Sequence, residues 1–175
     1  MNKAVMIAMQ PKCCELIASG RKTIEVRKIA PKIDTPFKCY LYQTKKKWIY
    51  RLLKKLGLYQ GKVIGEFVCD MIDEFLVFEN MTVQYWNCHN LEKSCLTYDE
   101  IANYIGANKN GYAWHISDLK IYNTPKELGE FYRWKKCDSC KMSGYEATAC
   151  MYDIDCKVPA RITRPPQSWM YVGEV

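Results

Sequence analysis

Short stretches with strand character outnumber the helices of this 175-residue chain, and this imbalance limits the folds that it can adopt. Two kinds of run indicate strands: continuous apolar runs, as at 4–9, and runs that alternate polar with apolar residues, as at 23–28. We expect about six strands and three or four short helices, too few helices for the crossovers of a parallel sheet. The pattern therefore predicts one α+β domain over 1–175, built on a mixed, mostly antiparallel sheet.

Residues typical of helix ends mark the expected helices. Pro11 suits the first turn of the first helix, and Gly20 follows its last residue. A threonine followed three residues later by a glutamate, the spacing of a capping box, occurs at 97–100 and at 124–127 and predicts a short helix at each place. Gly65 interrupts an otherwise continuous strand pattern, which indicates a bulge or a close approach of another backbone.

The stretch at 20–28, GRKTIEVRK, places charged side chains on one of the strands. Successive side chains of a strand point to opposite faces, so Ile24 and Val26 should face the core. The other face then carries Thr23, Glu25 and Arg27, with Lys22 at the entry to the strand. If that face is open to water, the charges form a weak surface pair of about 0–1 kcal/mol. If the first helix covers it, the charges line a ligand site, and the alternation alone does not decide between the two.

The motif Gly-x-Lys-x-x-Glu-x-Arg in this stretch, after a strand and a proline-started helix, resembles the ASCH (activating signal cointegrator homology) family of the PUA-like superfamily. The stretches PFKCYLYQT, GKVIGEFVCD, GYAWHISDLKIYNTPKELGEF and RPPQSW are similar to bacterial and phage-type members. The resemblance implies a small PUA-like β-barrel with short helices at its ends. It also implies a cleft beneath the first helix, lined by Lys22, Glu25 and Arg27, that takes RNA or a modified nucleotide.

The residue types at this cleft suit a nucleotide. Arg27 can hold a phosphate or a base edge with two parallel hydrogen bonds, and Lys22 supplies a point charge. Glu25 can orient Arg27 or accept a hydrogen bond from a base amino group. Further contacts are expected from Thr23, Gln167 and Ser168, while the aromatic Tyr112, Trp114 and Trp169 are candidates for base stacking that could equally be core residues.

An enzyme is the alternative reading of the same cleft. Some relatives are amidohydrolases of acylated cytidine, with a lysine in the place of Lys22 and a threonine nucleophile where this chain has Glu25. Other relatives have been proposed to cleave RNA. Lys22 and Glu25 would be the catalytic residues in either case, with Glu92, Asp99 or Glu100 as the further acid. The missing threonine favours a binding protein over a hydrolase.

Positive charge is concentrated in one window of the chain. The net charge is +7, and the window 35–65 holds eight basic residues and no acidic one. Such a local excess is typical of polyanion-binding surfaces, although a solvated helix face gives the same pattern. A basic helix inserted at 45–58 would present to a nucleic-acid backbone the residues Lys45, Lys46, Lys47, Arg51, Lys54 and Lys55.

A cysteine-rich segment at 137–156 forms a second insertion. Cys137 and Cys140 have the two-residue spacing of a zinc knuckle, and Cys150 and Cys156 would complete the four thiolate ligands of a structural zinc ion. The spacing of the second pair is wider than usual, so a redox dithiol and buried free thiols remain alternatives. As a third reading of function, this module would recruit a protein partner and make the chain an adaptor.

The location expected for the protein is the cytoplasm. The apolar run at the N-terminus is too short for a signal peptide, and no stretch approaches a membrane span, so no membrane partner is expected. The ten cysteines should then be mostly reduced. Of the two histidines, His115 lies in a strand pattern and is expected to be a hydrogen-bonded histidine of the core or its rim.

Overall fold

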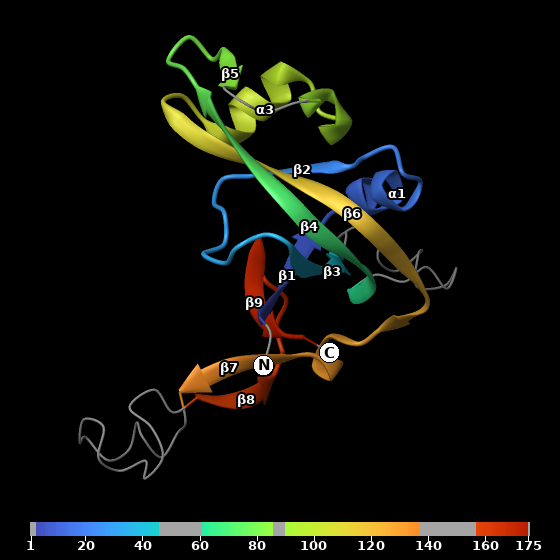
Figure 1. Cartoon of the computed structure of the whole chain (residues 1–175). Helices are drawn as coiled ribbons and strands as arrows, with labels where there is room; N and C mark the ends of the chain where they lie inside the picture. The colour runs from blue at the N-terminus through green and yellow to red at the C-terminus, as the bar shows by residue number, and fades with distance from the viewer. Residues whose placement is uncertain (1–2, 46–60, 86–89, 137–156, 175) are drawn as a thin grey trace, which may run out of the picture.

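The computed structural model of the chain describes residues 3–45, 61–85, 90–136 and 157–174 (Figure 1). Strands dominate these residues, and the helices among them are short. The strands are β1 (Lys3–Met9), β2 (Ile24–Arg27), β3 (Phe37–Gln43), β4 (Lys62–Val77), β5 (Val83–Tyr85), β6 (Lys109–Lys126), β7 (Tyr132–Lys136), β8 (Lys157–Arg161) and β9 (Trp169–Gly173). The helices are α1 (Pro11–Ala18), α3 (Tyr98–Ile105) and the 3-10 turns η1 (Leu91–Ser94) and η2 (Leu128–Glu130).

Seven strands form one sheet in the order β2-β6-β4-β3-β1-β9, with β5 paired to β4, while β7 and β8 pair only with each other among the described strands. The pair β1–β3 is parallel, and the other pairs are antiparallel. The long strands β4 and β6 pair with each other over most of their length and run side by side from the end of the sheet next to α3 and β5 (Figure 1). The predicted α+β class with a mixed, mostly antiparallel sheet is confirmed.

The two ends of the sheet meet through side chains. Trp169 at the start of β9 donates its indole N–H to the carbonyl of Ile29, which follows β2, over 3.1 Å. The hydroxyl of Tyr171 in β9 accepts the backbone N–H of Lys32 over 2.6 Å. The sheet therefore curves until the residues that follow β2, its first strand, meet β9, its last strand, as expected for a barrel-like fold.

Strand β2 is buried on both faces, which decides how its charges are placed. Ile24 and Val26 pack into a core cluster with residues of α3, such as Ile101. Glu25 lies opposite Trp114 of β6, which belongs to a different core cluster, so the charged side chains point to the other side of the sheet. The predicted alternation is confirmed, and the charged face is covered.

Two local predictions are confirmed and one is wrong. Thr97 and Glu100 cap α3 reciprocally, and Gly65 lies at a register shift where a Cβ atom would come 2.5 Å from the Lys120 carbonyl. The helix expected from 124 does not form, because β6 continues to Lys126, which pairs with Val63 of β4. A single turn, η2, follows instead, and its capping box begins at Glu127 rather than at a threonine.

The two predicted insertions fall largely outside the described residues: 137–156 entirely, and 45–58 apart from Lys45. Among the residues that are described, no helix has the length and apolar character needed to cross a membrane.

Candidate functional site

The turn after α1 sets the position of Lys22. Pro11 opens the helix, and Gly20 ends it with φ of +71°, a left-handed conformation that glycine adopts without strain. The backbone N–H of Lys22 then donates to the carbonyl of Leu16 over 3.0 Å, which folds the chain back beneath the helix. The Lys22 side chain is consequently only 2% exposed.

The ammonium group of Lys22 has an acceptor for each of its three N–H donors. Its Nζ atom lies 2.8 Å from the Ile24 carbonyl, 2.7 Å from the Ser94 carbonyl and 3.0 Å from Oε2 of Glu25. Ser94 is the last residue of η1, and its carbonyl oxygen is directed at this ammonium group. Lys22 therefore joins α1, β2 and η1, and no N–H is left over for a ligand in this arrangement.

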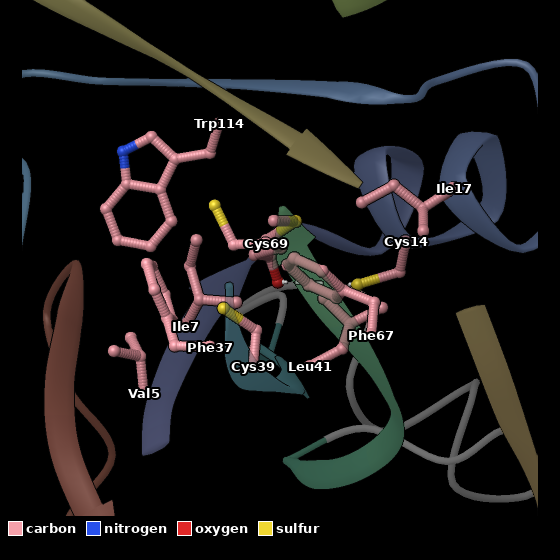
Figure 2. Packing of buried hydrophobic residues seen from close by; sticks show 11 residues of the cluster. Val5, Ile7, Cys14, Ile17, Phe37, Cys39, Leu41, Phe67, Cys69 and Trp114 are labelled. Carbon is pink, nitrogen blue, oxygen red and sulfur yellow. Dashed lines mark hydrogen bonds between the residues drawn. The ribbon is translucent and has the colours of Figure 1, made fainter. Parts of the chain in front are cut away.

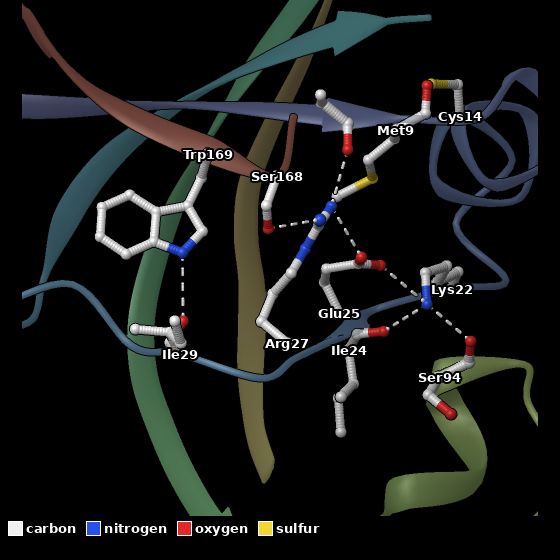
Figure 3. A network of polar contacts seen from close by, with 11 residues as sticks. Met9, Cys14, Lys22, Ile24, Glu25, Arg27, Ile29, Ser94, Ser168 and Trp169 are labelled. Carbon is white, nitrogen blue, oxygen red and sulfur yellow. Dashed lines mark hydrogen bonds and ion pairs between the residues drawn. The ribbon is translucent and has the colours of Figure 1, made fainter. Parts of the chain in front are cut away.

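Glu25 and Arg27 continue the same network (Figure 3). Oε1 of Glu25 lies 3.0 Å from Nη2 of Arg27, and that nitrogen also donates to the Ala8 carbonyl over 2.8 Å. Nη1 of Arg27 donates to Oγ of Ser168 over 3.1 Å. The third guanidinium donor, Nε, is buried and has no hydrogen-bond partner. The carboxylate is thus held between two cations, each bound to one of its oxygens.

Burial makes this network costly to disturb. Glu25 is 8% and Arg27 7% exposed, so all three charges have lost most of their contact with water. A buried charge is tolerated only when it is paired and hydrogen-bonded. Two cations face one carboxylate, which leaves an excess positive charge among the three residues. The site therefore favours a ligand with hydrogen-bond acceptors or negative charge.

Cys13 of α1 lies within electrostatic range of this site, which the sequence did not reveal. It is half-buried, and its thiol interacts electrostatically with all three network residues. Burial raises the pKa of Cys13, Glu25 raises it further, and Lys22 and Arg27 oppose the shift. Its neighbour Cys14 is buried in the core, where burial raises the pKa of that thiol to about 12. The one available signal was the position of Cys13 on the helix predicted to cover the strand.

The predicted ligand-binding residues around the network are partly brought together. Ser168 contacts Arg27 directly, and Gln167 beside it is exposed. Thr23 is half-buried. Its backbone N–H donates to the Lys93 carbonyl, and its backbone carbonyl accepts a hydrogen bond from the N–H of Ile116.

Trp114 has no exposed surface and packs edge-on against Phe37, so the base contact considered for it is wrong (Figure 2).

The other titratable candidates lie elsewhere. His115 is hydrogen-bonded to Asp73 over 2.8 Å, as expected for a structural histidine. It pairs with Ile24 in the sheet and so lies on the face opposite to Glu25. Glu100, one of the acids considered for catalysis, is occupied in capping α3.

The predicted basic and metal-binding residues are not tested by the structure. Lys45 is exposed just beyond β3, and the other five cations of the basic helix lie outside the described residues. The four predicted zinc ligands also lie outside the described residues: Cys137, Cys140, Cys150 and Cys156. Within the described ranges, no group of three or more histidine, cysteine or acidic residues could hold a metal ion.

A cavity of about 610 Å³ opens where β3 begins, and it shares no residue with the network around Glu25. Its lining mixes apolar with charged side chains, and two of the charged ones are paired with each other: Nζ of Lys38 lies 3.4 Å from a carboxylate oxygen of Glu174. We do not assign the ligand site to this cavity.

Comparison with known proteins gives the fold. No protein-family model and no curated protein matches the sequence. Among solved structures, the ASCH protein of Zymomonas mobilis is similar, with a TM-score of 0.57, 16% identity and coverage of 98% of this chain and 88% of that chain. The chain has the ASCH fold. Structures of two mutants of that protein are equally similar, each with a TM-score of 0.58 and 16% identity, covering 99% and 98% of this chain and 92% and 89% of theirs.

Proposed function

We propose that this ASCH-fold protein binds single-stranded RNA, or a single modified nucleotide, by holding an unpaired base at the Lys22–Glu25–Arg27 network. The observation that carries the proposal is the Glu25 carboxylate, fixed between two buried cations at 3.0 Å each, with 11% of its side chain still accessible. Two residues at the edge of the network, Cys13 and Ser168, are half-buried and would border the base.

The chemistry of the network matches a base edge. A carboxylate accepts hydrogen bonds from an exocyclic amino group, as carboxylates do from cytosine N4. The neighbouring guanidinium of Arg27 is a donor, and its Nη1 atom lies at the edge of the network beside the half-buried Ser168. An acceptor beside a donor is complementary to a base that presents an amino group beside a ring nitrogen or carbonyl. In duplex RNA these edges are occupied, so an unpaired base is the suitable ligand.

Binding is favoured over hydrolysis by the position of Lys22. A general base or nucleophile must present a free atom to the substrate. All three N–H donors of Lys22 are directed at protein acceptors, which suits a residue that positions Glu25. Hydrolysis of an acylated nucleoside or of RNA stays the alternative, and a cytoplasmic location remains part of the proposal.

Titration of a short fluorescently labelled RNA with the protein tests the proposal. We expect saturable binding that weakens when Ser168 is replaced by alanine. Absence of binding to RNA and to free nucleotides alike would contradict the proposal.

A further inference from the structure

The two-stranded sheet of β7 and β8 is rich in positive charge and lies apart in sequence from the basic window at 35–65. The stretches 131–136 and 157–164, which contain the two strands, hold six basic residues and no aspartate or glutamate. The basic residues are Arg133, Lys135, Lys136, Lys157, Arg161 and Arg164. Two aromatic residues, Tyr132 and Trp134, lie among them. We refer to these two stretches as the basic ribbon.

Exposed arginines occupy both faces of the basic ribbon. Tyr132 pairs with Arg161 across the two strands, and the guanidinium carbon of Arg161 lies 5.8 Å from the centre of the Tyr132 ring. Both side chains are exposed, so the ring and the cation form a flat, accessible platform. Arg133 is the next residue along β7, so its exposed side chain points to the opposite face.

The basic ribbon is attached to the main sheet by side-chain packing, since no hydrogen-bonded ladder joins the two among the strands that the structure describes. Phe131 and Ile162, which flank the strands, are buried in a core cluster, and the N–H of Ile162 donates to the Phe131 carbonyl over 3.0 Å. Trp134 packs near Gly173 at the end of β9, where a Cβ atom would lie 4.0 Å from the indole nitrogen. Figure 1 shows β7 and β8 projecting beside the end of β9.

We propose that the basic ribbon is a second contact surface for single-stranded RNA, separate from the site around Glu25. Guanidinium groups bind phosphate through paired donors, and no carboxylate within the ribbon competes for them. The Tyr132–Arg161 platform suits stacking of an exposed base, which a duplex does not offer. The proposal rests on the proposed function in one respect: both sites are meant to bind the same RNA.

The distance between the two sites suits one RNA strand. Ser168, which contacts Arg27, immediately precedes β9, and Gly173, which faces Trp134, ends it. Five residues of extended chain span about 16 Å. A trinucleotide whose central base is held at the Glu25 site extends one nucleotide to either side and would not cover the ribbon, whereas a longer strand would.

The test compares a ribbon variant, R133A/R161A, with a control that removes the same charge elsewhere, K109A/K120A, whose lysines are exposed on β6. Affinity is measured by fluorescence anisotropy for a cytidine trinucleotide and for a single-stranded RNA of about 16 nucleotides. We expect the ribbon variant to bind the long RNA about five- to tenfold more weakly. Because two phosphate contacts are lost, the slope of the logarithm of the association constant against the logarithm of the salt concentration should be shallower by about 1.4. The control should match the wild type, and the trinucleotide should bind all three proteins equally.

Each outcome has a defined meaning. Unchanged affinity of R133A/R161A for the long RNA overturns the ribbon proposal, as does an equal loss in the control. The proposal is also overturned if the wild type binds duplex RNA or phosphatidylserine vesicles more tightly than it binds the long single-stranded RNA. If Ser168→Ala leaves trinucleotide binding unchanged but R133A/R161A weakens the long RNA, the base site fails and the ribbon stands. Circular dichroism verifies folding, and R133Q/R161Q replaces any alanine variant that loses its native spectrum.

Discussion

Nη1 of Arg27 donates a hydrogen bond to Oγ of Ser168 over 3.1 Å, between residues 141 positions apart in the chain. Arg27 ends β2, the first strand of the sheet order, and Ser168 precedes β9, the last. The bond therefore contributes to closing the sheet and also fixes the guanidinium beside Glu25. Fold and candidate site depend on the same contact.

Replacement of Ser168 by alanine should affect both stability and binding. Arg27 loses an acceptor in a partly buried position, so we expect the free energy of unfolding to fall by about 1–2 kcal/mol. RNA affinity should fall about fivefold as the guanidinium loses its orientation. Chemical denaturation and fluorescence anisotropy measure the two effects. Ser117→Ala is the matched control, because that half-buried serine bonds the Val68 carbonyl away from the site. Equal RNA affinity for both variants would argue against the role of Ser168.

Replacement of Lys22 by methionine should destabilise the protein strongly. The substitution removes one partner of a buried ion pair and leaves the Ser94 and Ile24 carbonyls without their donor, so we expect a loss of about 3–5 kcal/mol. Lys62→Met is the control: its pair with Glu127 is close, at 2.6 Å, but the Glu127 side chain is 64% and the Lys62 side chain 30% exposed, so the pair should contribute at most about 1 kcal/mol. Urea denaturation of both variants gives the comparison. Similar losses in the two would show that the network around Glu25 behaves as a surface pair.

The reactivity of Cys13 should report the charge of Glu25. Because burial and then Glu25 raise the pKa of this thiol, it should be largely protonated at neutral pH and alkylate slowly, with the rate rising only in alkaline solution. Glu25→Gln removes the negative charge, lowers the pKa of Cys13 and should accelerate its alkylation about two- to fivefold at fixed pH. Iodoacetamide labelling with peptide mass spectrometry measures the rate. The exposed Cys95 serves as an internal control whose rate should not change. An unchanged or slower rate at Cys13 would contradict the placement of Glu25 beside it.

Metal analysis tests the cysteine-rich segment. The spacing of Cys137, Cys140, Cys150 and Cys156 predicts about one zinc ion per chain in protein purified without chelator. Substituting Cys137 by serine should remove the metal. Metal-free protein with four additional titratable thiols would disprove the zinc prediction.

The sequence predicted the parts of the site that depend on local pattern. Alternation in GRKTIEVRK placed Glu25 and Arg27 on one face, and Gly20 correctly marked the end of the first helix. Whether that face was covered could not be predicted, because its partners are distant in sequence: Lys22 meets Ser94 across 72 positions, and Arg27 meets Ser168 across 141. Periodicity carries no information about such contacts.

Strands of low periodicity were missed for a related reason. Half of the residues of β7 and β8 are lysine or arginine, and β8 contains a proline; lysine and proline are unfavourable in strands, and the pairing of the two strands is set by contact with each other. The helix expected from 124 was overridden by the pairing of Lys126 with Val63. In both places tertiary contact decided the structure against the local signal.

Base preference tests the central claim most directly. Cytosine and uracil are of equal size, but only cytosine presents the amino group that Glu25 would accept. The measurement is the ratio of the dissociation constants of oligouridine and oligocytidine of equal length, at one salt concentration. We predict tighter binding of oligocytidine by roughly tenfold, as expected for about 1–3 kcal/mol of discrimination. A ratio near one, or tighter binding of oligouridine, would contradict recognition of a base by Glu25.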